Sequence, residues 1–369
     1  MKIFNIALFM IMAPVLCYMQ SNKNIVELKY LYTLVNGDNQ NTKEYLFKKP
    51  TDVKIDGYNN IYVTEYHGSN IFKYTKDGQY LSTLGRVGNG PGEFNEIRTY
   101  DIFQNKIIVC GSANNLTEYS TDCKLLRTIP LSSDTYYMRQ ICNYTSNKYL
   151  IMKFRDNTAV ENIFYIYDNK LEKQITSFGH PSIMFDTNSP IYQNERSALN
   201  ILVLANGDVV IAKQYYDGKI YCYDHNNNWK HKVYSSNKEY RNYRILSPDE
   251  IGEERYNNLR RFYDNKTNKQ IGILLRTLSV GLLRYENRYI LNFVVQCNNS
   301  NLEAELGIEV YSIKCEYLGY YRINNTNIIS KGIRTKVFCI DNDNCVLIHD
   351  NSPSGIPQIK KFKLNIDIK

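Results

Sequence analysis

Short apolar runs alternate with turn-forming residues along most of the chain. From Pro50 the sequence reads PTDVKIDGYNNIYVTEYHGSNIFKYTKDGQYLSTLG, with the apolar runs DVKI, NIYVTE, NIFKYT and QYLSTL between the turn signals DGYNN, HGSN and KDG. The Asp-Gly pair is a hairpin signature, because Gly tolerates the positive φ that a tight hairpin turn demands. Four strands in a meander over about 36 residues are typical of one β-propeller blade.

The same unit recurs along the chain with drift. The third strand and its hairpin, IFKYTKDGQYLSTLG, return as LTEYSTDCKLLRTIP, IFYIYDNKLEKQITSFG, IYCYDHNNNWKHKVYS, IEVYSIKCEYLGYYRI and QIKKFKLNI. The second strand repeats as IYVTE, IIVCG, YLIMKF, VVIAKQ, YILNFV and CVLIHD. These six copies predict an all-β fold, a six-bladed β-propeller that spans residues 24–369 as one domain.

The sixth copy lacks a fourth strand after KFKLNIDIK, whereas the run IVELKYLYTLVNG at residues 25–37 is a strand without a blade. Pairing this N-terminal strand into the last blade would remove two exposed strand edges at once. We therefore expect the N-terminal strand to close the ring. Deletion of residues 24–36 should then destabilise the whole propeller.

One stretch departs from the strand pattern. Residues 247–270 begin with Ser-Pro-Asp-Glu and carry apolar residues at helical spacing, namely Ile251, Tyr256, Leu259 and Phe262. This pattern predicts a short helical insertion between blades four and five. The insertion is interpreted as a surface decoration, with a lid over one face as the alternative.

Composition supports a β fold and excludes some classes of function. Tyr, Ile, Val, Phe and Thr are plentiful, and Asn, Asp and Gly cluster between the apolar runs. The formal net charge of +8 is spread along the chain without a block of Lys or Arg, so nucleic acid is not an expected partner. The nine Cys form no CxxC pair, and the sequence therefore predicts no zinc site.

The N-terminus has the features of an export signal. Lys2 precedes the apolar stretch IFNIALFMIMAPVL, which is short for a transmembrane span, so residues 1–23 are interpreted as a signal or lipoprotein-like segment. Cys17 is the candidate lipidation site, although Val15 and Leu16 stand where a lipobox has small residues. An uncleaved anchor remains an alternative. We expect an exported protein, periplasmic or at the cell surface, whose only membrane contact is this N-terminal anchor.

Eight Cys follow position 17, an even number that would suit an oxidising compartment. Most lie within or beside apolar strand-like runs, where a buried thiol packs as a small apolar group. Disulfides therefore remain open, and the sequence assigns no pair.

The run from residue 50 to 94, which ends in GRVGNGPGEF, resembles NHL-type repeats, particularly those of exported bacterial six-bladed β-propeller proteins. In that family a Gly-rich G-x-G-P-G-E-F follows the last strand of a blade. We interpret GRVGNGPGEF as the corner between blades one and two. A phosphate cradle is not favoured, because Gly88, Gly90 and Gly92 alternate and no helix start follows.

The resemblance implies a binding face around the central channel, formed by the loops that join blades and by those between second and third strands. An Arg recurs near the start of the innermost strand in EIRTYD, YMRQIC, LLRTLS and GIRTKV. Converging guanidinium groups attract anions and can grip a carboxylate bidentately, whereas pairing with acidic neighbours is the alternative. The candidate ligand-binding residues are Arg98, Arg139, Arg276, Arg334, Glu65, His67, Arg86, Glu93 and His349.

The sequence offers no clear catalytic or metal motif. The five His are dispersed, and DNDN at residues 341–344 lacks the Gly and distal Glu that a calcium loop needs. We predict no catalytic residue, no metal ligand and no cofactor, with calcium open but unsupported by a motif. Exposed Tyr pairs could instead stack on sugars or peptides, although most Tyr should pack between blades.

These observations favour a binding or scaffold module. The expected partner is a protein or an anionic ligand such as an acidic glycan, held by the face loops. The alternative is a metal-dependent hydrolase or lyase that works in the channel.

Overall fold

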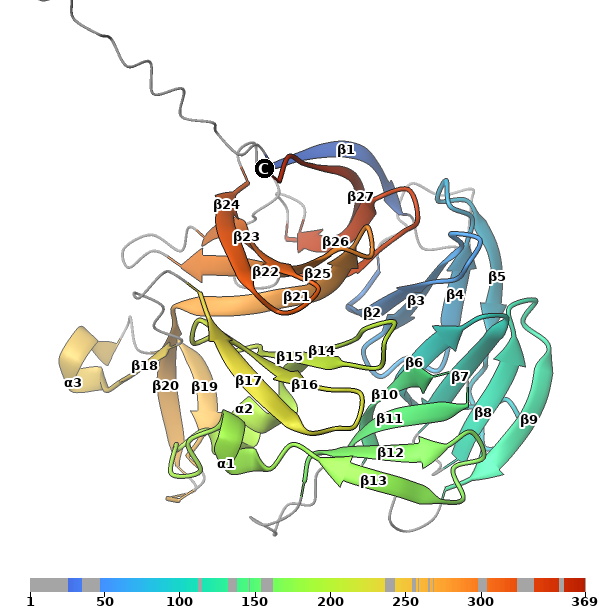
Figure 1. The fold of residues 1–369 in the computed structure, drawn as a ribbon, viewed down its shortest axis with the longest axis horizontal. Helices are drawn as coiled ribbons and strands as arrows, with labels where there is room; N and C mark the ends of the chain where they lie inside the picture. Colours follow the sequence, from blue (N-terminus) through green and yellow to red (C-terminus); the bar gives the residue numbers. More distant parts are fainter. Residues whose placement is uncertain are drawn as a thin grey trace, which may run out of the picture.

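The computed structural model describes residues 26–34, 47–111, 115–131, 138–145, 147–153, 162–235, 243–253, 257, 259–264, 266–267, 269–297, 304–323, 335–351 and 355–368. Within this part of the chain, the strands form six four-stranded antiparallel sheets and one three-stranded sheet. The four-stranded sheets are arranged around a common centre, with the first strand of each blade innermost (Figure 1). The predicted all-β, six-bladed β-propeller is confirmed.

Each blade follows the strand order expected from the repeats. Blade one consists of β2 (Pro50–Ile55), β3 (Ile61–Glu65), β4 (Ile71–Tyr74) and β5 (Tyr80–Leu84). Blade two consists of β6 (Ile97–Phe103), β7 (Lys106–Gly111), β8 (Asn115–Ser120) and β9 (Leu125–Pro130). Blade three consists of β10 (Met138–Thr145), β11 (Lys148–Lys153), β12 (Phe164–Asp168) and β13 (Gln174–Phe178). Blade four consists of β14 (Leu199–Val203), β15 (Val209–Lys213), β16 (Lys219–Tyr223) and β17 (Trp229–Tyr234). Blade five consists of β21 (Thr277–Tyr285), β22 (Tyr289–Cys297), β23 (Ala304–Ser312) and β24 (Tyr317–Arg322).

The sixth blade is shared between the two ends of the chain. It contains β25 (Lys336–Ile340), β26 (Cys345–Asn351) and β27 (Pro357–Ile366), and its outer strand is β1 (Val26–Leu34). β1 pairs antiparallel with β27 from Val26 opposite Ile366 to Leu34 opposite Ile359. The expected closure of the ring by the N-terminal strand is confirmed, and it satisfies the outer edge of β27.

Aspartates build several of the hairpin turns. In DGYNN, the Oδ1 atom of Asp56 accepts hydrogen bonds from the backbone N–H groups of Tyr58 and Asn60, both at 2.9 Å. In DNDN, the Oδ1 atom of Asp341 accepts from the N–H groups of Asp343 at 2.9 Å and Cys345 at 2.8 Å. Such side-chain-to-backbone bonds stabilise tight turns, so DNDN is a hairpin turn, as interpreted from the sequence.

The Gly-rich run GRVGNGPGEF is the corner between blades one and two, because it connects β5 to β6. Phe94 is fully buried, and its N–H donates to the carbonyl of Arg86 at 2.8 Å. Gly85 has a φ of +82°, and a Cβ there would lie 2.7 Å from the carbonyl oxygen of Ser69. The corner therefore needs glycine for both conformation and space.

Lysines on third strands connect neighbouring blades in a repeated way. The Nζ atom of Lys73 on β4 donates to the carbonyl of Thr121, in the turn between β8 and β9 of the next blade, at 2.7 Å. Lys361 on β27 reaches the carbonyl of Lys76, in the turn between β4 and β5, at 2.9 Å. The junction between the last and first blades thus resembles an ordinary junction inside the ring.

Apolar side chains fill the space between blades. A buried cluster joins blades one and two, and the Tyr100 hydroxyl donates to the carbonyl of Tyr62 at 2.8 Å. Both tyrosines are fully buried. The expectation that many tyrosines pack between blades holds at this junction, where each polar tip finds a backbone acceptor.

The insertion at residues 247–270 contains less helix than the sequence pattern suggests. α3 begins after a Ser247–Glu250 capping box, as the Ser-Pro-Asp-Glu signal predicts, but spans only Pro248–Ile251. The chain then forms β19 (Arg260–Tyr263) and β20 (Gln270–Leu275), which pair with β18 (Tyr243–Leu246) in the three-stranded sheet. Phe262 packs on the ring at Tyr215, because burial of this aromatic side chain outweighs the helical spacing.

A second insertion lies between blades three and four. It contains α1 (Pro181–Met184) and α2 (Tyr192–Ser197). The sequence pattern does not reveal these helices because both are shorter than two turns.

Candidate functional site

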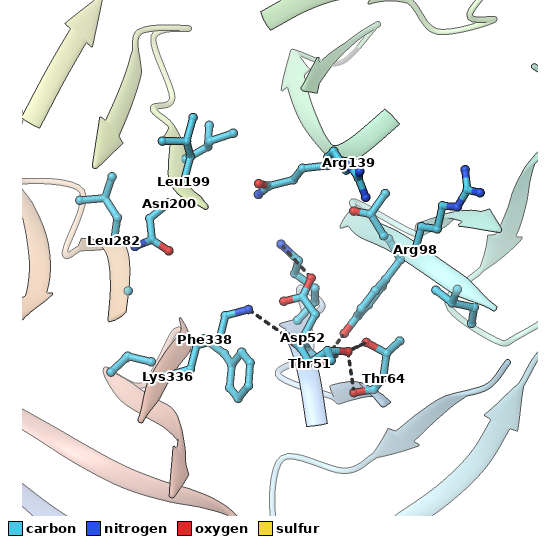
Figure 2. A pocket seen from close by; sticks show the side chains of 18 residues that line it. Thr51, Asp52, Thr64, Arg98, Arg139, Leu199, Asn200, Leu282, Lys336 and Phe338 are labelled. Carbon is cyan, nitrogen blue, oxygen red and sulfur yellow. Dashed lines mark hydrogen bonds and ion pairs between the residues drawn. The ribbon is translucent and has the colours of Figure 1, made fainter. Parts of the chain in front are cut away.

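A cavity of about 230 Å³ occupies the central channel (Figure 2), and we call it the channel cavity. The first strands of all six blades contribute to its wall. The lining residues are Thr51, Asp52, Lys54, Thr64, Ile97, Arg98, Thr99, Tyr100, Arg139, Gln140, Leu199, Asn200, Ile201, Gly281, Leu282, Lys336, Val337 and Phe338.

A larger cavity of about 600 Å³, the mouth cavity, adjoins it. Its lining residues are Thr51, Glu65, Tyr66, His67, Glu96, Ile97, Arg98, Met138 and Arg139. The two cavities share four residues, including Arg98 and Arg139. These two arginines therefore stand where the channel opens onto one face of the ring.

Arg98 and Arg139 occupy equivalent positions on neighbouring blades. The pairing of β6 with β7 shifts register between Ile97 and Thr99, opposite Gly111 at the end of β7. The pairing of β10 with β11 shifts in the same way between Met138 and Gln140, opposite the last residue of β11. Such a β-bulge changes the direction of the extra side chain, so neither arginine follows the alternation of side chains along the rest of its strand. Both side chains are exposed.

Lys54 forms the charged centre of the channel wall. Its Nζ atom lies 3.9 Å from Oδ2 of Asp52 and 3.8 Å from Oδ1 of Asp101. Burial acts to lower the pKa of Lys54, but the carboxylates of Asp52 and Asp101 outweigh burial and raise this pKa above its usual range. Lys54 is therefore protonated, and its positive charge is balanced by the two carboxylates.

Lys336 is a second channel lysine with different surroundings. Its Nζ atom donates to the carbonyl of Thr51 at 2.7 Å, the bond drawn in Figure 2. Within the described residues, no carboxylate lies within ion-pair distance of this amine. Burial lowers the pKa of Lys336, against the opposing charge of Asp52 and with help from Lys54.

Two other predicted residues lie at the mouth cavity. His67 places Nδ1 2.7 Å from Oε1 of Glu96, and Glu65 accepts a hydrogen bond from the backbone N–H of Lys48 at 2.5 Å. Both side chains line the mouth cavity with the arginines. The structure thus brings together Arg98, Arg139, Glu65 and His67.

The remaining predicted residues lie elsewhere. Arg86 and Glu93 form an ion pair, with Nε of Arg86 2.8 Å from Oε1 of Glu93. This pair connects the two ends of the Gly-rich corner. His349 is buried on β26, with its ring 6.5 Å from that of Phe338, and Arg276 is half-buried just before β21. None of these four lines either cavity.

Two predicted residues are outside the described part of the chain. Arg334, the fourth arginine of the expected ring, lies there, as does the proposed lipidation site Cys17.

Sequence reasoning missed the polar residues deeper in the channel. Asp52 and Lys54 alternate on β2, Lys336 is on β25, and Asn200 is on β14. The signal was available in the first-strand runs, because polar residues at alternate positions of an innermost strand share one sheet face at the rim of the channel.

Other features of the described residues bear on chemistry. No group of three or more His, Cys, Asp or Glu side chains there could hold a metal ion. All eight described cysteines are free thiols. In this part of the chain, no helix has the length and apolar character to cross a membrane.

Comparison with known proteins identifies the family. The model of DUF5128, described as a 6-bladed beta-propeller, matches residues 40–239. A crystal structure from Bacteroides fragilis, of a protein named as a candidate for export, is 15% identical with a TM-score of 0.56, covering 94% of this chain and 96% of that chain. A DUF4221 family member from Bacteroides vulgatus is 11% identical with a TM-score of 0.54, covering 94% and 100%.

These two solved structures support the fold alone, and no curated protein matches the sequence. The narrower resemblance to NHL-type repeats stays a prediction. Because the family model covers more than half of the chain, the protein belongs to the DUF5128 family of six-bladed β-propellers.

Proposed function

We propose that the protein binds an anionic ligand, such as the end of an acidic glycan, where the channel opens between Arg98 and Arg139. The positive charge of the channel cavity is the main support for this proposal. Its lining includes the cations Lys54, Lys336, Arg98 and Arg139 and a single carboxylate, Asp52. Lys54 is already neutralised by Asp52 and Asp101, whereas Lys336 and Arg139 have no ion-pair partner among the described residues, so the cavity keeps positive charge that attracts an anion.

The position of the arginines supports this role. Guanidinium groups recognise carboxylates through paired N–H donors, and both arginines come from adjacent inner strands that contact each other. Within the described residues, no carboxylate forms an ion pair with Arg139. The carboxylates of the mouth cavity have partners of their own, because Glu96 lies against His67 and Glu65 accepts from a backbone N–H.

We also propose where the protein acts and that it does not cleave its ligand. The predicted signal segment at residues 1–23 would place the ring outside the cytoplasm, where acidic polysaccharides occur. All described strands lie between Val26 and Ile366, so removal of residues 1–23 leaves each of these strands intact. The module binds and does not cleave its ligand.

The test compares an acidic oligosaccharide with a neutral one of equal length. Calorimetric titration of the protein without residues 1–23, at low and at high salt, should show binding of the acidic chain alone, weakened by salt. Equal binding of both chains, or none, would contradict the proposal. Chromatography of the same mixtures with and without EDTA separates binding from hydrolysis, since metal-dependent cleavage would favour the alternative of a channel enzyme.

A further inference from the structure

A chain of hydrogen bonds leads from the channel cavity to a buried carboxylate. Asn200 on β14 donates through Nδ2 to the carbonyl oxygen of Ser279 at 3.0 Å and to its Oγ at 2.9 Å. The Oγ of Ser279 donates to Oδ1 of Asn292 at 2.6 Å, and Nδ2 of Asn292 donates to Oε2 of Glu309 at 3.0 Å. Ser279, Asn292 and Glu309 are completely buried.

This chain fixes which way the Asn200 amide points. A backbone carbonyl accepts but never donates, so the amide group that faces the Ser279 carbonyl must be the NH₂ group. The Oδ1 atom is therefore left for the channel, where Asn200 lines the cavity (Figure 2). Glu309 anchors the far end of the chain, because the Tyr311 hydroxyl also donates to its Oε2, at 2.8 Å.

A fixed acceptor serves a ligand that carries hydrogen-bond donors. Simple carboxylates have none, whereas sugar hydroxyls donate and accept. The same cavity is lined by Lys336, whose amine is a hydrogen-bond donor, and by the half-buried Phe338, which offers an aromatic face. A flat apolar wall with a few oriented polar groups suits a hydroxylated ring.

The size of the cavity agrees with one ring. Pockets for drug-sized ligands have volumes of roughly 300–1,000 Å³. At about 230 Å³, the channel cavity is smaller and would hold a single sugar residue rather than a chain. The longer part of a glycan would leave through the adjoining mouth cavity of about 600 Å³.

We propose that the channel cavity is a subsite for one hydroxyl-bearing ring, the terminal sugar acid of the ligand, and that Asn200 selects it by accepting from a ring hydroxyl. This inference rests on the proposed function, since Arg98 and Arg139 hold the carboxylate of the same ligand. The chain from Ser279 through Asn292 to Glu309 positions Asn200 and does not contact the ligand.

Three matched probes separate the two proposals. Glucuronate carries the charge and the ring hydroxyls, cyclohexanecarboxylate carries the charge on a bare six-membered ring, and methyl glucoside carries hydroxyls without charge. Calorimetry on the wild-type protein should give an affinity for glucuronate about 3- to 10-fold above that for cyclohexanecarboxylate, as expected for one or two added hydrogen bonds.

Asn200→Ala should abolish this preference while leaving affinity for cyclohexanecarboxylate within about twofold. Phe338→Leu provides a second variant, which should weaken glucuronate and methyl glucoside alike by about 3-fold or more. Unchanged circular dichroism and thermal midpoint show that each variant is folded. A purely structural Asn200 would leave the ratio between the two acids unchanged.

Equal wild-type affinity for the two acids, or a preference that survives Asn200→Ala, would overturn the sugar subsite and leave the anion site standing. Binding of methyl glucoside as tightly as glucuronate, with both lost in Asn200→Ala, would support the subsite and overturn the anion site. Absence of binding by all three probes would overturn both.

Discussion

The Nζ atom of Lys361 lies 2.8 Å from Oδ2 of Asp341, and both side chains are buried, with 5% and 0% exposed. The same amine donates to the carbonyl of Lys76 in the first blade. This ion pair therefore lies where the last blade meets the first. Its position makes it part of the closure of the ring.

Loss of the lysine charge should destabilise the ring strongly. Lys361→Met leaves the Asp341 carboxylate buried and unpaired, which typically costs about 3–5 kcal/mol of unfolding free energy. Urea denaturation measures this change. Lys29→Met, at an exposed position of β1 in the same sheet, is the control and should stay within about 0.5 kcal/mol of wild type. A similar small effect of Lys361→Met would show that the pair contributes nothing to closure.

The N-terminal strand should be needed for the stability of the whole ring. Deletion of residues 24–36 removes β1 and exposes the edge of β27, so we expect a large drop in the thermal midpoint. Leu34→Ala, at a buried position of β1, should cost about 2–5 kcal/mol. A protein that lacks only residues 1–23 is the control. An unchanged midpoint after loss of β1 would refute closure by this strand.

The repeat pattern predicted blade number, strand order and closure, because each blade is a local unit with its own turns. It failed where tertiary contacts decide the structure. Phe262 has helical spacing but lies on β19, packed against Tyr215. Arg98 and Arg276 share the dipeptide Arg-Thr, yet only Arg98 lies at a register shift, because such shifts depend on pairing across strands. The chain from Asn200 to Glu309 crosses two blades and has no local sequence signal.

Two thiols, those of the buried Cys110 and the half-buried Cys142, should be unreactive in the folded protein. Burial raises the pKa of Cys110 and of Cys142 to about 12, so hardly any thiolate exists at pH 8. Mass spectrometry after brief iodoacetamide treatment should find both residues unmodified in the native state and modified in urea. Alkylation of both sites at the same rate in the two states would contradict the raised pKa values of these thiols.

Binding of a carboxylate ligand should depend on the protonation of Lys336. Burial lowers the pKa of this lysine, so its charge is lost at a lower pH than the charge of an ordinary exposed lysine. Affinity for glucuronate should therefore fall about fivefold at a pH below the usual lysine range, while the arginines remain charged. Lys336→Met should bind more weakly at neutral pH and lose this pH dependence. An identical profile in the variant would exclude Lys336 from the site.

The central claim is that Arg98 and Arg139 grip one anion, and a double-mutant cycle tests it most directly. Affinity for the acidic oligosaccharide is measured by calorimetry for Arg98→Met, Arg139→Met and the double variant. Arg86→Met is the matched control, because its guanidinium pairs with Glu93 outside both cavities. Each single change should cost about 1.5–3 kcal/mol of binding free energy, with a coupling above about 0.5 kcal/mol between them. Losses no larger than that of the control would contradict the account.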